Sequence, residues 1–286
     1  AQTPVEKGLK SINRQAAEAY IGFLADDELQ GREAGFHGSR VAARYIASLL
    51  KEMGIRPLGE SYYQPFDAYR KERQQKGRLE VHPDSIAKLK QVVHQKLSMN
   101  NVLGMIPGKK TNEYVIVGAH FDHLGIDPAL DGDQIYNGAD DNASGTVGIM
   151  AIANAFAKAK ADGKGPKRSI LILHVTGEEH GLLGSKYYVE NPLFPLANTV
   201  ANINIDMIGR SDVEHAKNNQ YVYVIGADKL SSDLHIITEE ANSLYTNIKL
   251  DFRYNDFNDP NRFYYRSDHY NFAKNGVPAI FFFNGV

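Results

Sequence analysis

Residues 113–120 read EYVIVGAH and run directly into FDHLG at 121–125. The first stretch is almost entirely apolar, which predicts a strand buried on both faces in the interior of a sheet. This strand ends at His120, and Asp122 and His123 follow it at once. In parallel sheets ligands bind beyond the carboxyl ends of the strands, so these three side chains indicate a site at that edge.

The chain from residue 100 onward continues this alternation of apolar strands and amphipathic helices. Strands are expected at 101–107, 169–175, 200–206, 221–226 and 278–283, and helices at 144–160, 182–190, 231–244 and 268–275. Nearer the N-terminus, apolar residues at helical spacing predict helices over 38–53 and 84–97. Alternating strands and helices imply an α/β fold with a mostly parallel sheet covered on both faces.

The composition restricts the kinds of site that this chain can build. Its 286 residues include 32 Lys+Arg and 34 Asp+Glu, a net charge of −2, which makes nucleic acid a poor candidate partner. No apolar run approaches the ~18 residues that span a bilayer. The chain has no cysteine, which excludes thiolate catalysis, disulfides and Cys-ligated metals. A metal site must therefore be built from histidines and carboxylates.

Acidic residues and histidines recur at the predicted strand ends and in glycine-rich loops. They are Asp140 and Asp141 in NGADDNASG, Glu178 and Glu179 in GEEHGLLGS, Asp206 at the end of the strand at 200–206, and Asp268 and His269 in YRSDHY. Taken singly, each has a commoner structural explanation, such as a helix N-cap. Carboxylates gathered at one edge repel one another unless a cation binds between them. Oxygen and imidazole donors suit zinc, with cobalt or manganese as alternatives.

These motifs, in this order, resemble those of the M28 family of zinc aminopeptidases. The resemblance covers nearly the whole chain, from LQGREAG at 29–35 to YYRSDHYNFAKNGVPAIFF at 264–282. It implies a three-layer α/β/α fold with a mixed, mainly parallel sheet, as in phosphorylase/hydrolase-like zinc exopeptidases, and we expect one such domain over residues 1–286. Many members are exported. Because the chain starts at Ala1 rather than Met, we expect a periplasmic or secreted bacterial protein whose signal peptide has been removed.

The resemblance also implies a role for each candidate residue. It implies that His120 and Asp206 bind a first zinc ion, that Asp140 bridges two zinc ions, that Glu179 binds the second, that Glu178 is the general base and that Asp122 orients His120. It further implies a cis peptide bond between Asp140 and Asp141. Asp268, His269 and Tyr265 are expected to line or support the substrate pocket.

The second zinc ion of the family uses a histidine that follows the last strand. This chain ends at Val286, before any such segment. We therefore expect the second zinc site to be incompletely supplied within this chain and the domain to lack its C-terminal end.

Hydrolysis of N-terminal residues from peptides is the primary functional hypothesis. A glutaminyl-peptide cyclase, which has the same fold and a single zinc ion, is an alternative, although His120 beside Asp122 favours two metals. A metal-free binding domain is a second alternative, and the retention of every candidate ligand argues against it. Carboxypeptidase and dipeptidase activities stay open.

Overall fold

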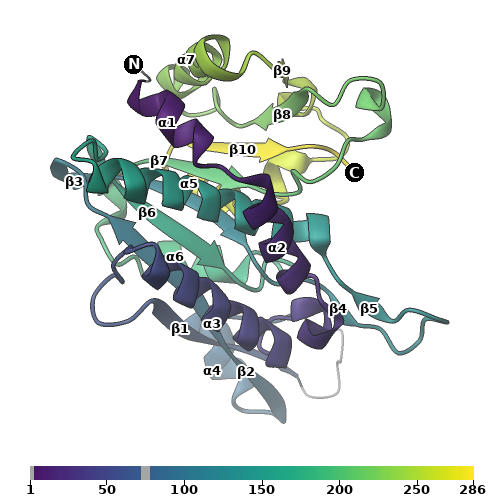
Figure 1. Ribbon diagram of the computed structural model, residues 1–286. Helices are drawn as coiled ribbons and strands as arrows, with labels where there is room; N and C mark the ends of the chain where they lie inside the picture. Colours follow the sequence, from purple (N-terminus) through teal and green to yellow (C-terminus); the bar gives the residue numbers. More distant parts are fainter. Residues whose placement is uncertain (1–2, 72–77) are drawn as a thin grey trace.

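A computed structural model describes residues 3–71 and 78–286. Ala1, on which the expectation of a removed signal peptide rests, lies outside the described residues. At its centre is one eight-stranded sheet in the order β1–β2–β6–β3–β7–β10–β8–β9 (Figure 1). These strands are β1 (Tyr63–Lys71), β2 (His94–Ile106), β3 (Lys110–His120), β6 (Arg168–Val175), β7 (Thr199–Ile205), β8 (Tyr221–Ile225), β9 (Lys249–Asp251) and β10 (Ala279–Phe283). A short hairpin, β4 (Gly125–Ile126) with β5 (Ile135–Tyr136), projects from the loop after β3.

The sheet is mixed and mainly parallel, as expected. The pairs β6–β3, β3–β7, β7–β10 and β8–β9 are parallel, whereas β1–β2, β2–β6 and β10–β8 are antiparallel. The strands predicted at 113–120 and 169–175 lie next to each other at its centre, and each is buried over most of its length. Burial on both faces explains why neither stretch shows a polar alternation.

Helices cover both faces of the sheet and make the three layers predicted. The helices are α1 (Pro4–Lys10), α2 (Arg14–Leu24), α3 (His37–Glu52), α4 (Pro83–Leu89), α5 (Gly145–Ala161), α6 (Leu183–Glu190), α7 (Ser232–Ala241) and α8 (His269–Ala273). On the near face in Figure 1, α2, α3 and α5 share one apolar core with β2, β3 and β6. On the opposite face, α6 and α8 pack against the same strands in a second core.

One helix ends earlier than the sequence indicated. The helix predicted over 84–97 is α4, which ends at Leu89, and the residues from His94 onward belong to β2. Leu97 is buried and pairs with Ala68 of β1, so the apolar periodicity of this stretch reflects strand pairing in its second half. Pairing with β1, which the sequence of this stretch alone does not show, makes its second half a strand.

The parallel strands direct their carboxyl ends to the same edge of the sheet. His120, the last residue of β3, pairs with Val175 at the end of β6, and β7 ends one residue before Asp206. Within the part of the chain that the structure describes, no helix is both long and apolar enough to cross a membrane.

Candidate metal centre

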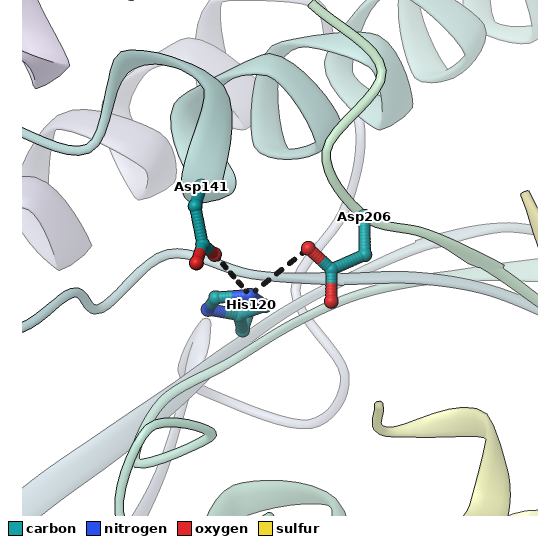
Figure 2. Close-up of side chains that lie close together, drawn as sticks. All are labelled: His120, Asp141 and Asp206. Atoms are coloured by element: carbon teal, nitrogen blue, oxygen red, sulfur yellow. Dashed lines mark hydrogen bonds and ion pairs between the residues drawn. The ribbon is translucent and has the colours of Figure 1, made fainter. Parts of the chain in front are cut away.

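Three side chains converge at the end of β3. Nε2 of His120 lies 3.2 Å from Oδ1 of Asp141 and 3.3 Å from Oδ1 of Asp206, as Figure 2 shows. One ligand atom from each residue lies within 4.8 Å of the other two. His120 is almost completely buried, because it terminates a central strand. One imidazole facing two carboxylates is an arrangement that a divalent cation stabilises.

A second group lies next to the first and shares Asp141 with it. Nδ1 of His123 lies 2.7 Å from Oε1 of Glu179 and 3.9 Å from Oδ2 of Asp141. The two oxygens of Asp141 therefore point to different histidines, with Oδ1 toward His120 and Oδ2 toward His123. A carboxylate divided between two sets of ligands has the geometry of a bridge between two metal ions.

Asp141, rather than Asp140, belongs to both candidate ligand groups. Asp140, expected to bridge, instead accepts hydrogen bonds from the Gly209 amide (2.6 Å) and the Ser144 hydroxyl (3.2 Å), and its Oδ2 lies 3.0 Å from Nε of Arg210. Asp140 thus fastens the loop to the segment after β7, and its neighbour Asp141 points into the site. The cis peptide bond expected between Asp140 and Asp141 is displaced likewise and lies between Asp141 and Asn142.

The second group also contains an imidazole that was not expected there. The sequence indicated that the second site lacks its histidine, but the turn after β3 places His123 beside Glu179. The FDHLG motif contained the signal, because a histidine three residues beyond His120 can turn back toward the same edge. The two groups together supply two imidazoles and three carboxylates, a donor set that fits zinc.

Glu178 and Asp122 lie beside these groups without belonging to either of them, among the described residues. Oδ1 of Asp122 accepts a hydrogen bond from the Glu178 amide (3.2 Å) and lies 3.6 Å from Nδ1 of His120. The backbone carbonyl of Asp122 is nearer to that nitrogen, at 3.2 Å. Asp122 thus lies beside His120 and accepts a hydrogen bond from the backbone of Glu178.

The electrostatics of the site follow from burial among like charges. Burial, together with the carboxylates of Asp206, Asp268 and Glu179, raises the pKa of Glu178 well above its usual value, although His120 opposes the shift. Burial acts to lower the pKa of His120, but the Asp206 and Glu178 carboxylates outweigh it and raise that pKa well above 6.5. When no cation is bound, protonation of these groups reduces the electrostatic repulsion between the carboxylates.

The three residues expected at the substrate pocket are placed differently from one another. Asp268 is buried near the first group, where it accepts a hydrogen bond from Ser185, and burial raises its pKa to about 7. His269 is fully buried with its ring stacked on Phe281, a core position rather than a pocket wall. Tyr265 packs against the ring of Tyr270 and lies only partly exposed. Of the three, Asp268 lies near the candidate ligands, whereas His269 packs in the core.

Two further residues support the site and were not singled out from the sequence. Ser267 donates a hydrogen bond of 2.7 Å to Oδ2 of Asp206 and accepts one from Asn204. Arg32, in the N-terminal segment, donates to the backbone on either side of the candidate ligands and is completely buried. Neither role leaves a local sequence pattern, because both depend on segments far apart in the chain.

The α/β fold thus carries two adjoining groups of candidate metal ligands at the carboxyl edge of its sheet. The sequence profile of peptidase family M28 matches residues 101–285, and this chain belongs to that family.

Curated relatives cover parts of the chain. Leucine aminopeptidase 2 of Trichophyton equinum is 30% identical over 194 residues, 65% of this chain and 34% of that protein. A probable glutamate carboxypeptidase of Arthroderma benhamiae is 37% identical over 124 residues, 39% of this chain and 16% of that protein. The chain thus spans about a third or less of these relatives' length.

Solved structures show the same fold at low sequence identity. LapB from Legionella pneumophila has a TM-score of 0.68 at 18% identity, covering 100% of this chain and 65% of its own. BSAP, a zinc aminopeptidase from Bacillus subtilis, has a TM-score of 0.66 at 17% identity, covering 96% and 86%. A glutaminyl cyclase from Porphyromonas gingivalis has a TM-score of 0.63 at 18% identity, covering 96% and 84%.

Proposed function

We propose that this chain is the catalytic part of a zinc-dependent aminopeptidase with two metal ions. The observation that carries the proposal is the position of Asp141, whose two oxygens face two different histidines. Asp206 would complete the set of ligands beside His120, and Glu179 the set beside His123. Membership of a peptidase family and the aminopeptidases among its relatives support the same assignment.

The ligand set fits two zinc ions, which, when bound, would lower the pKa of a water molecule and polarise the scissile carbonyl of a peptide. We assign the proton transfer to Glu178. Its carboxylate belongs to neither ligand group among the described residues, and its backbone is held by Asp122. In the proposed reaction Glu178 accepts a proton from the attacking water and returns it to the leaving amine, as a general base and then a general acid.

Removal and return of the metal tests this function. The chain is dialysed against a chelator and assayed on leucine p-nitroanilide with and without added zinc. Activity that depends on zinc, on a free α-amine in the substrate and on Glu178 supports an aminopeptidase. Glu178→Gln should lower kcat by about 10²–10⁴-fold while the variant still binds zinc. Full activity in this variant would overturn the assignment of the base.

Two controls separate the alternatives within the fold. N-acetyl-leucine p-nitroanilide, which has no free amine, should not be cleaved. Ammonia release from a peptide that begins with glutamine would instead indicate a cyclase, the activity named for one structural neighbour. Release of a C-terminal residue from an N-blocked peptide would indicate a carboxypeptidase, as the name of one relative suggests.

A further inference from the structure

Arg32 is a fully buried cation that has no carboxylate as a hydrogen-bond acceptor among the residues the structure describes. All four of its side-chain hydrogen bonds go to backbone carbonyls. Nε donates to Phe121 (2.8 Å), Nη1 to Leu24 and Asn137 (2.6 Å for the latter), and Nη2 to Gly138 (2.8 Å). A buried charge is unfavourable unless such hydrogen bonds satisfy it, so this contact set holds Arg32 in one position.

Three of the four acceptors belong to the two loops that carry the candidate metal ligands, and the fourth, Leu24, ends α2. Phe121 lies between His120 and Asp122, and the carbonyls of Asn137 and Gly138 begin the loop that leads to Asp141. The guanidinium is planar with a fixed fork of donors, so it fixes the distance between these two loops.

The backbone of the same segment strengthens this connection. The Arg32 carbonyl accepts a hydrogen bond from the His123 amide (3.3 Å), and Glu33 forms a β-bridge with His123. Asn137 also binds the N-terminal segment, because its side-chain amide donates to the Ala25 carbonyl and to the Asp27 carboxylate at 2.7 Å each. The N-terminal segment thus holds both loops from one side.

The chain takes up an unusual conformation to turn Arg32 inward. Gln30, Gly31 and Arg32 all have φ between +50° and +65°. Positive φ is unfavourable for residues other than glycine and is retained where surrounding contacts require it. At Gly31 a Cβ would meet the carbonyl oxygens of Gly125 (2.3 Å) and Tyr136 (2.7 Å), so the turn packs directly against the β4–β5 hairpin.

We propose that Arg32 is a positioning residue that fastens the 121–123 and 137–141 loops to each other, so that their ligands converge before a metal binds. The idea that this convergence serves a metal rests on the proposed function. The contacts themselves do not, and Arg32 lies outside the region that the family profile matches, which begins at residue 101. Its positive charge also lies near the Asp122, Asp141 and Glu179 carboxylates, which it stabilises.

Hydrogen exchange of the metal-free chain tests the proposal directly. The reporting amides are His123, which donates to Arg32, and Ala143, which donates to the Gly138 carbonyl. Arg32→Lys keeps the positive charge but removes the planar guanidinium that donates to several carbonyls at once. It should speed exchange at both amides by about 10-fold relative to amides of β6, the ratio expected for loss of one charge-assisted hydrogen bond. Unchanged exchange at both amides would overturn the proposal.

A matched control separates this role from general stability. Ile46→Ala removes a fully buried side chain of α3 and should lower the melting temperature without a selective effect on the two loop amides. An equal selective effect in Ile46→Ala would count against Arg32 as the specific clamp. Should Arg32→Lys fail to fold, Arg32→Gln, which is neutral and shorter, is measured in the same way.

Zinc affinity distinguishes a failure of this proposal from a failure of the proposed function. Competition with a chelator should show zinc binding about 10–100-fold weaker in Arg32→Lys and unchanged in Ile46→Ala, as expected for a group that orients ligands. Equal affinity in the wild-type chain and in Arg32→Lys would refute the positioning of ligands. A wild-type chain that binds no zinc would refute the metal function, and the exchange result would still decide whether Arg32 fastens the loops.

Discussion

Ser267 donates a hydrogen bond of 2.7 Å to Oδ2 of Asp206, whose other oxygen, Oδ1, lies 3.3 Å from Nε2 of His120. The two oxygens of this carboxylate thus have different partners, one a hydroxyl and the other a candidate zinc ligand. The hydroxyl leaves Asp206 little freedom to rotate, so Oδ1 stays directed at the site.

Ser267→Ala should therefore weaken zinc binding by about 10–100-fold, because Asp206 loses the group that orients it. A chelator-competition titration measures the affinity, and circular dichroism confirms the fold. Ser48→Ala, which removes an exposed hydroxyl on α3, is the control and should bind zinc as the wild-type chain does. Wild-type affinity in Ser267→Ala would show that this hydrogen bond has no part in the site.

The adjacent residues Asp140 and Asp141 provide a matched pair of substitutions. Asp141→Asn should reduce zinc binding at both sites, because its two oxygens face both histidines. Asp140→Asn should bind two zinc ions and lose stability instead, since Asp140 holds the Gly209 amide and Arg210. Zinc content by atomic emission and thermal melts distinguish the two. A loss of zinc confined to Asp140→Asn would restore Asp140 as the bridge.

His123 is predicted to hold one zinc ion and not the other. In His123→Ala, the zinc content should fall from two ions to one, because Glu179 loses its imidazole neighbour while His120 and Asp206 are retained. His180→Ala, which removes the half-buried histidine that follows Glu179 in the sequence, should leave the zinc content unchanged. Two zinc ions bound with wild-type affinity in His123→Ala would mean that another donor completes the second site.

The buried His174 predicts a pH dependence of stability that is independent of the metal. Burial lowers the pKa of this residue to about 3 from 6.5, and neither ring nitrogen has a hydrogen-bond partner among the described residues. Between these two values the unfolded chain binds a proton that the folded chain does not, so stability is complete above pH 6.5 and falls as the pH is lowered. The slope from one such residue is about 1.4 kcal/mol per pH unit.

His174→Leu should remove that slope. Urea unfolding at pH 7, 6, 5 and 4 measures the free energy of unfolding for both chains, and the variant should lose less stability on acidification. His269 is buried with a similarly lowered pKa and contributes a second slope that the variant retains. Identical pH dependence in the two chains would show that His174 is solvated or partnered in the folded state.

Much of the fold could be predicted from the sequence because it depends on local patterns. The apolar runs at 113–120 and 169–175 predict strands buried on both faces, and both are central strands of the sheet. The end of the helix predicted over 84–97 was wrong, because Leu97 takes its conformation from pairing with β1. Helical periodicity and strand alternation look alike over such short stretches.

The candidate site shows the same division between local and long-range information. The sequence by itself determined that carboxylates and histidines follow strands whose carboxyl ends meet at one edge, and the absence of cysteine restricted a metal to those donors. It could not decide between Asp140 and Asp141, since adjacent identical residues differ only in the direction of their side chains. In the tertiary structure Asp141, rather than Asp140, points toward the two histidines, His123 lies beside Glu179 and Arg32 turns inward. All three depend on contacts between loops that are distant in the chain, and apart from the histidine in FDHLG no local pattern indicates them.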